Sequence, residues 1–434
     1  MKLTPHANRS LFILAAVNAV NWSDRQVFGL VLQDISTEFH LSDTQAGFLM
    51  GFAFAAFYAV FGVPIARLAD RGNRASIIAV SIALWGAAVA ACGLTRNFVQ
   101  LIVVRICLAI GEAGCWPASQ SLISSLFSRD ERTRALSRYM LGGFLGNLIT
   151  VLAGWANERF GWRTVLFGLG TVAVPLALMV ATLVKDPRTT LPRRVGKNAD
   201  IPADVPENET SAPAFPELVK KLCANPTFLH VAIYICLGFL FGSGLGVWIP
   251  AFFRRSYHMQ TTELAAWLSA TNVITGIIGL WGGGEWFARY APCNDRRQLM
   301  VMAGLSIVMC IFNSLTFMSH DKYVAFACFA ISGVAYSACQ GCIYSVLFSV
   351  IPDHMRAVAL SIVLLVANFA GAGLGPWVVG AVSDFLGPTL GEEGLRYALI
   401  AMLPGYIWGT WHLWRASQSV VADTLVVEEA ITVV

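Results

Sequence analysis

The chain has 434 residues, of which 56% are apolar and only 13% are charged, about half the charged fraction of an ordinary soluble domain. This composition argues against a soluble enzyme, a disordered chain and a nucleic-acid-binding protein, and the net charge of +4 is too small for this length to indicate a polyanionic partner. The apolar residues instead suffice for about twelve membrane-spanning helices of ~20 residues each.

Twelve apolar stretches follow one another along the chain and predict an all-α polytopic membrane protein with twelve transmembrane helices in two six-helix pseudo-repeats. The first six stretches define an N-terminal bundle over residues 1–184, and the last six define a C-terminal bundle over residues 227–415. Residues 185–226 are rich in proline and charge, so we expect a cytoplasmic linker there. Residues 416–434 are expected to form a cytoplasmic tail. Most of the 30 Lys and Arg residues lie in loops on the side of both termini, which predicts that both termini are cytoplasmic.

A weak internal repeat relates the two halves. The fifth stretch ends in Gly154-Trp-Ala-Asn-Glu158, and the eleventh ends in Gly380-Ala-Val-Ser-Asp384. Two six-helix repeats around a linker are typical of a secondary transporter. Glycine pairs spaced by four residues recur in equivalent stretches, and we expect them to form a sliding interface between the halves. These pairs are Gly47/Gly51, Gly142/Gly146, Gly279/Gly283 and Gly371/Gly375.

The loop after the second stretch predicts a conformational latch. It begins with Gly62 and ends in Asp70-Arg71-Gly72-Asn73-Arg74, where a tight turn at Gly72 places a carboxylate among arginines. Such a carboxylate can hold one helix end against another. The alternative is an ordinary basic cytoplasmic loop. The corresponding segment of the second half, 284–297, lacks the pattern, so an equivalent second latch is not expected.

Four charged side chains lie well inside predicted spans: Asp24 and Arg25 in the first, and Arg105 and Glu112 in the fourth. Each costs roughly 2.5–3.5 kcal/mol to insert, so each needs a partner or a water-filled cavity. Arg105 and Glu112 are two helical turns apart on one face, and Asn21 lies one turn before Asp24. We therefore predict one charge network in which Asp24 or Glu112 takes up a proton and frees an arginine. A static cluster that only fixes helix packing is the alternative.

The tenth stretch carries Tyr336, Gln340 and Tyr344 on one helical face. They form either a cavity wall that faces the charges from the other half or a packing stripe. The lone polar residues of other spans, such as Asn147 and Asn272, are expected to be structural. The histidines show no ligand spacing, and the Cys339/Cys342 pair, although spaced as CxxC, lies within a span and is interpreted as packing. No nucleotide-binding or nucleophile motif is present, so the sequence predicts no enzyme, no metal site and no cofactor.

The loop Asp70-Arg71-Gly72-Asn73-Arg74 resembles the signature loop of the major facilitator superfamily. The segments Asn21-Trp-Ser-Asp24-Arg25-Gln26, Gly111-Glu112-Ala113 and Gly161-Trp162-Arg163 resemble the spinster-like branch of that superfamily in a bacterial form. The resemblance implies the major facilitator fold, the bacterial inner membrane, and transport of lysophospholipids or sphingoid lipids with Asp24, Arg25, Arg105 and Glu112 as the charged site. Residues 111–117 also resemble the anion:cation symporter branch, which carries small organic acids.

We therefore expect a proton-coupled secondary active transporter of an amphipathic anionic or zwitterionic lipid that works by alternating access. The substrate would bind between the halves, near the charge network and the stripe of the tenth span. A symporter of a small organic anion and a membrane receptor or scaffold without transport are the alternatives. We expect a monomer whose partners are a small amphipathic substrate and membrane lipid, with no nucleic acid, and with the proton gradient in place of a cofactor.

Overall fold

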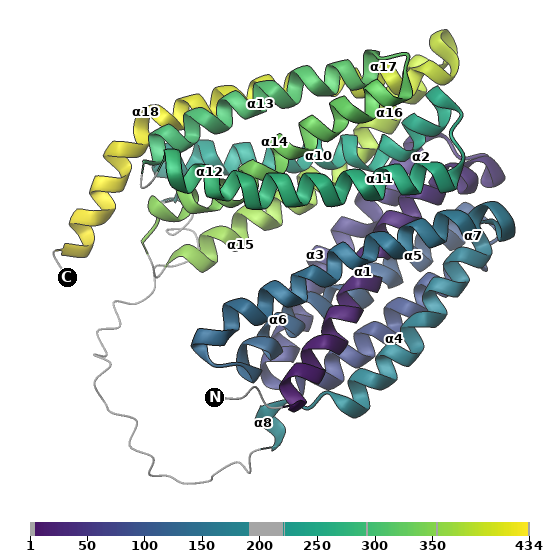
Figure 1. Cartoon of the computed structure of the whole chain (residues 1–434), viewed down its shortest axis with the longest axis horizontal. Helices are drawn as coiled ribbons and strands as arrows, with labels where there is room; N and C mark the ends of the chain where they lie inside the picture. The colour runs from purple at the N-terminus through teal and green to yellow at the C-terminus, as the bar shows by residue number, and fades with distance from the viewer. Residues whose placement is uncertain (1–4, 191–219, 221, 292–293, 353–354, 433–434) are drawn as a thin grey trace.

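The computed structural model describes residues 5–190, 220, 222–291, 294–352 and 355–432, and helices account for the regular structure within these ranges. Two helical bundles lie side by side (Figure 1). They converge at one end of the molecule, whereas the labelled N- and C-termini lie toward the other end. The arrangement therefore has a closed end and an opposite end that carries both termini.

The first bundle is built around α1, which packs extensively against α7. Its helices are α1 (Pro5–Phe39), α2 (Asp43–Met50), α3 (Phe52–Arg71), α4 (Arg74–Cys92), α5 (Phe98–Ala113), α6 (Cys115–Leu126), α7 (Arg129–Leu183) and α8 (Pro187–Thr190). The 55-residue α7 contains two crossings, because Gly161 has a φ of 76° that interrupts the helix between them. A φ in this region favours glycine, which carries no Cβ.

The second bundle contains two π-helical segments. Its elements are α10 (Pro226–Tyr257), α11 (Thr261–Thr275), η1 (Gly276–Gly282), α12 (Gly283–Tyr290), α13 (Asp295–Met318), α14 (Lys322–Ser349), α15 (Arg356–Val366), η3 (Ala367–Ala372), α16 (Gly373–Leu390), η4 (Gly391–Glu393), α17 (Gly394–Met402) and α18 (Pro404–Thr432). Short π segments within helices are frequent at functional sites, and η1 lies on the central cavity described below.

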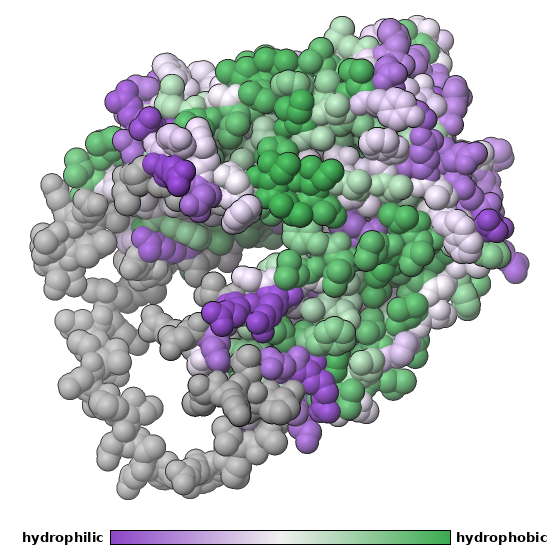
Figure 2. All heavy atoms as spheres, in the orientation of Figure 1, coloured by the Kyte–Doolittle hydropathy of each residue, from purple (hydrophilic) through white to green (hydrophobic). Residues whose placement is uncertain are grey.

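Nine stretches of the described residues are long and apolar enough to cross a membrane. Two of them, Arg134–Leu183 and Val358–Leu425, each hold two crossings joined by a reversal, and α1 adds a further 35-residue helix. Together they make the twelve crossings predicted from the sequence. Figure 2 shows apolar residues over the visible face of both bundles and hydrophilic residues gathered toward their ends, which suits a lipid-facing surface.

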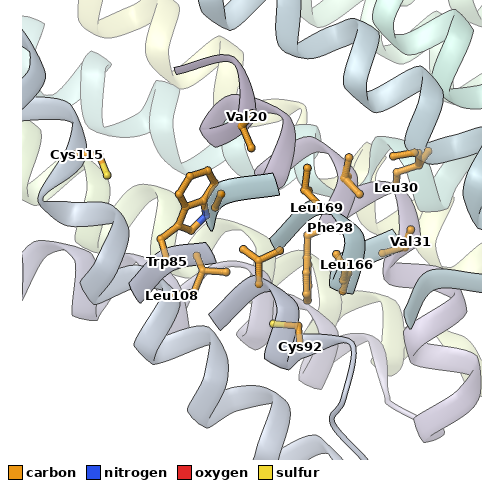
Figure 3. Packing of buried hydrophobic residues seen from close by; sticks show 14 of the residues in the cluster. Val20, Phe28, Leu30, Val31, Trp85, Cys92, Leu108, Cys115, Leu166 and Leu169 are labelled. Atoms are coloured by element: carbon orange, nitrogen blue, oxygen red, sulfur yellow. The ribbon is translucent and has the colours of Figure 1, made fainter. Parts of the chain in front are cut away.

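The interior of the first bundle is close-packed. Figure 3 shows Phe28 of α1, Trp85 of α4, Leu108 of α5 and Leu166 of α7 pointing into a shared interior, where each is at most 1% exposed. Side chains from four helices therefore hold α1 in place.

One sequence-based boundary changes, and another falls mostly outside the described residues. The region 416–434, expected to be a separate tail, begins inside α18, where Ala416 and Val420 are fully buried in the second bundle's core. α18 therefore continues without a break past residue 415. Of the linker 185–226, only the segment as far as Thr190, together with 220 and 222–226, is described, so most of it lies outside the described residues.

The glycine pairs were expected to line the interface between the halves, and for three of the four pairs this is wrong. Gly142 and Gly146 abut α1 within the first half, and the pairs in η1/α12 and in η3/α16 abut neighbours within the second half. Only Gly47 and Gly51 meet the other half, at the backbone of Pro376 and Gly373 in α16. The spacing predicts close approach, but it does not identify the partner helix.

Candidate functional site

The four membrane-embedded charges form one cluster inside the first bundle, between α1 and α5. The Arg25 Nε donates to Glu112 Oε1 at 3.0 Å, and the Asn21 amide donates to the same oxygen at 2.6 Å. Asp24 is fully buried and interacts electrostatically with Glu112, Arg105 and Arg25. The structure therefore brings together the five residues Asn21, Asp24, Arg25, Arg105 and Glu112 that the sequence grouped.

Aromatic side chains enclose the two arginines of this cluster. The Arg105 guanidinium carbon lies 3.9 Å from the ring centre of Phe28, and that of Arg25 lies 4.9 Å from the ring centre of Phe54. Such cation–π contacts are attractive when the cation is desolvated. The Trp85 Nε1 donates to Asp24 Oδ2 at 3.4 Å. Rings from α1, α3 and α4 therefore contact the cluster, while the Arg25 side chain remains 46% exposed.

Several polar atoms of the cluster have no hydrogen-bond partner within the described part of the chain. They are Asp24 Oδ1, Glu112 Oε2, and Arg105 Nε and Nη1. An unpaired buried polar atom is costly unless a proton or a water satisfies it. The cluster therefore has unused capacity to bind a proton on either acid.

A central cavity of about 730 Å³ lies between the two halves. Its polar lining comes from both bundles: Asn18, Gln26, Asn147, Ser243, Thr271, Asn272, Thr275, Asn313, Ser332, Tyr336, Ser337 and Tyr406. Aromatic and aliphatic side chains such as Trp116, Phe144 and Ile249 form the rest of the wall. Among the described residues that line it, none carries a full charge. The predicted charge network therefore lies beside the cavity and not on its surface.

The predicted stripe of α14 divides between two spaces. Tyr336, Gln340 and Tyr344 all line a smaller cavity of about 60 Å³ inside the second bundle. Of the three, only Tyr336 also lines the central cavity. The stripe is therefore a wall of the second bundle, and the structure does not place it opposite the charge network.

Two further polar residues of the cavity wall were expected to be structural. The Asn272 Nδ2 donates to Gln26 Oε1 at 3.2 Å, and the Gln26 amide lies 3.5 Å from Asn147 Oδ1. These contacts join α1 and α7 of the first half to α11 of the second. In the sequence, the position of Gln26 directly after Arg25 could have identified Gln26 as a functional residue.

At the closed end, charged residues hold the halves together. The Arg254 Nη2 lies 2.8 Å from Asp34 Oδ1, and the Arg255 guanidinium binds both oxygens of Asp43 at 2.7 Å. Arg254 and Arg255 end α10, whereas Asp34 lies near the end of α1 and Asp43 begins α2. Each pair therefore crosses from one bundle to the other.

The internal repeat of the sequence lies at this closed end. In α16, Asp384 accepts the backbone N–H groups of Asp43 and Thr44 at 2.9 and 2.8 Å, which caps the start of α2. In α7, Glu158 accepts the backbone N–H of Thr262 at 2.7 Å at the start of α11. Each acid thus satisfies free N–H groups of a helix in the opposite half. The repeat is visible in the sequence, but the contacts of its two acids are visible only in the structure.

Of the predicted latch, the structure describes one strong contact. The Arg74 side chain is buried and binds Asp186 beyond the end of α7 at 2.6 and 2.9 Å, and its Nη1 donates to the Ser121 carbonyl of α6 at 2.8 Å. Gly72 ends α3 ahead of this contact, and Gly62 lies within α3. The side chains of Asp70 and Arg71 lie outside the described residues.

Two pseudo-symmetric six-helix bundles around a central cavity define a polytopic membrane transporter. The chain matches the family model of the Major Facilitator Superfamily over residues 14–376, and it belongs to that family. The membership supports transport and not catalysis as its activity.

Individual relatives indicate the branch of the family to which the chain is similar. The chain is 29% identical to an "MFS-type efflux pump" of Mycolicibacterium smegmatis, with 98% of both chains covered. It is 27% identical to protein spinster homolog 1 of Xenopus tropicalis, over 87% of this chain and 73% of that one. A crystal structure of a bacterial homolog to the human lysosomal transporter spinster, in an inward-facing and unoccupied conformation, superposes with a TM-score of 0.81 at 25% identity, covering 97% of this chain and 98% of the other. The resemblance to the spinster-like branch is therefore confirmed.

Proposed function

We propose that the protein moves a single-chain amphipathic lipid, such as a lysophospholipid or sphingoid lipid, across the membrane by proton-coupled alternating access. The observation that carries this proposal is the central cavity. Its volume of about 730 Å³ lies within the range of small-molecule binding sites, and its wall combines amide and hydroxyl groups with broad apolar surfaces.

Room for an alkyl chain continues from this cavity into the second bundle. Gly238, Gly242 and Gly246 follow one face of α10; Gly238 lines the smaller cavity, Gly246 the central one, and Gly242 both. A Cβ added at any of the three would meet no atom within 4 Å. The three glycines span about 12 Å of helix. An apolar tail can therefore lie along α10 while its head group stays in the central cavity.

The lining of the central cavity also indicates which kind of head group it can bind. A bare anion buried in a water-poor site needs a cationic partner, and no described residue of the wall is charged. Neutral amides and hydroxyls suit a zwitterionic or hydroxyl-bearing head group better. This favours an amphipathic lipid over the small organic anion. A receptor or scaffold without transport is disfavoured because, among the described residues, the ion pairs and helix caps between the halves gather at the closed end, as alternating access requires.

The coupling proton belongs to the buried cluster. Asp24 and Glu112 each retain one unpaired oxygen, and protonating either acid leaves the cluster with an excess positive charge. The proposal places the protein in the bacterial inner membrane as a monomer with both termini cytoplasmic, so that the closed end faces outward and the cavity inward. The proton gradient is the source of energy, with no cofactor.

Purified protein in lipid vesicles tests this proposal. Uptake of a labelled lysophosphatidylcholine should depend on the protein and rise several-fold when a proton gradient is imposed, and a labelled small sugar acid should not be taken up. Protein-dependent uptake of the sugar acid alone would reverse the choice of substrate. Uptake of neither compound, with or without the gradient, would contradict transport.

A further inference from the structure

The charge cluster and the central cavity have no lining residue in common, yet α1 contributes side chains to both. Asn21, Asp24 and Arg25 face α5 and the cluster. Asn18, Trp22 and Gln26, which are spaced by four residues, line the cavity. Positions four residues apart share one face of a helix. α1 is thus a two-sided helix with the proton-binding groups on one side and cavity groups on the other.

Gln26 makes the polar contact between α1 and the opposite half at the cavity wall. Its Oε1 accepts from Asn272 of α11 at 3.2 Å, and its amide lies 3.5 Å from Asn147 Oδ1 of α7. Asn147 is itself joined to α11, because its carbonyl accepts from the Ser269 hydroxyl at 3.1 Å. A rotation of α1 would therefore break the Gln26–Asn272 bond while α7 and α11 stay connected.

Near Ala15 and Ala19, α1 contacts α7 through two glycines. Gly142 and Gly146 of α7 abut the α1 backbone, and a Cβ at Gly146 would lie 2.6 Å from the Ala19 carbonyl. Backbone-to-backbone contact leaves no interdigitated side chains at these positions to resist turning. On the other side of α1, Glu112 Oε1 accepts from both Asn21 and Arg25. Protonation of Glu112 weakens two of the bonds that set the orientation of α1.

We propose that Gln26 is the positioning residue that transmits protonation of the buried cluster to the substrate cavity. When the cluster gains a proton, α1 turns and the Gln26 side chain exchanges Asn272 for the polar head group of the substrate. This inference rests on the proposed function, since it requires both a proton and a substrate.

Two helices, α1 and α6, connect the groups that face Asp24 and Glu112 to the cavity wall. These groups are Arg25 of α1, Tyr58 of α3, Trp85 and Cys92 of α4, Arg105 of α5 and Cys115 of α6. None of them is among the described residues that line the central cavity. A change of charge in the cluster therefore reaches the cavity wall through the movement of a helix. Of the two helices, α6 contributes Cys115 and the cavity residue Trp116, whereas α1 contributes Asp24 and Arg25 to the cluster and Gln26 to the contact with Asn272.

One test is the pH dependence of binding by the purified full-length chain. We expect lysophosphatidylcholine affinity of the unaltered protein to differ about tenfold between pH 5.5 and 7.5, within the usual range of coupling between two sites. Gln26→Leu should bring this ratio below about twofold, as Glu112→Gln should. The matched control Ser243→Ala alters a cavity hydroxyl on α10, and it should keep the tenfold ratio whatever it does to affinity. A tenfold ratio in Gln26→Leu would overturn the role of Gln26.

A second test needs no ligand and no change of pH. Glu112→Gln mimics the protonated acid, so at constant pH it should increase hydrogen exchange of the α11 peptide that contains Asn272. In a Gln26→Leu background the same substitution should add no further exchange, because the connection is already lost. Additive effects, or no effect of Glu112→Gln on α11, would contradict the inference even if transport itself is confirmed. Gln26→Asn serves as the milder variant if Gln26→Leu expresses poorly.

If the unaltered protein binds lysophosphatidylcholine with the same affinity at pH 5.5 and 7.5, the result counts against proton coupling, which is part of the proposed function. The hydrogen-exchange result would still decide whether Gln26 links the cluster to α11. The two claims therefore fail in different experiments.

Discussion

Asp384 at the end of α16 and Thr44 at the start of α2 belong to opposite halves, yet one carboxylate oxygen of Asp384 accepts both the Thr44 backbone N–H at 2.8 Å and its hydroxyl at 2.5 Å. Glu158 makes the corresponding contact with Thr262 at the start of α11. The closed end is therefore held by two reciprocal helix caps, one contributed by each half, in addition to the ion pairs of Arg254 and Arg255.

We predict that Asp384→Ala and Glu158→Ala each open this end. Loss of a cap costs about 0.5–2 kcal/mol. Because these caps form only when the halves are together, their loss destabilises the closed state alone. The open population should therefore rise roughly tenfold for each ~1.4 kcal/mol. Distances between spin labels on α2 and α16 measure that population.

Asp321→Ala is the matched control for the two caps. Asp321 caps α14 within its own half by accepting the N–H groups of Tyr323 and Val324. Its removal should lower stability without opening the closed end. Equal opening in all three variants would show that general destabilisation, and not the cross-half caps, controls the gate.

Arg74 should be essential for stability at the opposite end. Arg74→Met removes the guanidinium that binds the buried Asp186 carboxylate, and breaking a buried pair in this way costs about 3–5 kcal/mol, so the melting temperature should fall by several degrees. The double variant Arg74→Met/Asp186→Leu should recover much of the loss. Arg9→Met removes an exposed hydrogen bond to the Leu183 carbonyl and should change the melting temperature little. A fall in melting temperature as large as that of Arg74→Met would contradict a particular role of the buried pair in stability.

The same pair predicts an acid-dependent loss of stability. Burial alone would raise the pKa of the Asp186 carboxyl, but hydrogen bonds from the Arg74 side chain and backbone outweigh it and lower the pKa from 3.8 to about 2. Because the folded pKa is depressed, this stabilisation of about 2 kcal/mol is complete above about pH 5 and is lost as the pH falls through about 2. Unfolding followed between pH 5 and 2 should show this slope, and Asp186→Asn should reduce it. An unchanged slope in Asp186→Asn would contradict the assignment.

Gly242→Leu should shorten the lipid tail that the protein accepts. Its side chain would extend into the junction of the two cavities, where a Cβ meets nothing within 4 Å. Binding of a long-chain lysophosphatidylcholine should weaken about tenfold or more, while a short-chain one keeps its affinity. Gly304→Leu is the control, because Gly304 of α13 is exposed and also has open space before it. Equal losses of affinity for the long-chain and the short-chain lipid would show that the tail does not lie along α10 at Gly242.

The sequence predicted the charge cluster because isolated charges inside an apolar span are costly. In addition, Asp24, Arg25, Arg105 and Glu112 lie at similar depths in their predicted spans. The sequence did not predict that the cluster would be separate from the cavity, since helical spacing gives a residue's face but not the neighbour of that face. Asn272 was expected to be structural for the same reason, and Gln26 was assigned no role of its own. The twelve crossings followed from hydropathy, whereas the partner of Gly142 depends on how helices pack within the first bundle, and the partner of Asp384 depends on how the two bundles meet.

Proton-driven uptake by Glu112→Gln tests the central claim most directly. In vesicles, this variant should still exchange labelled lysophosphatidylcholine for unlabelled lipid at equal pH, because the cavity is intact, but it should no longer accumulate the lipid when a proton gradient is imposed. Gradient-driven accumulation equal to that of the unaltered protein, in both Glu112→Gln and Asp24→Asn, would contradict the account.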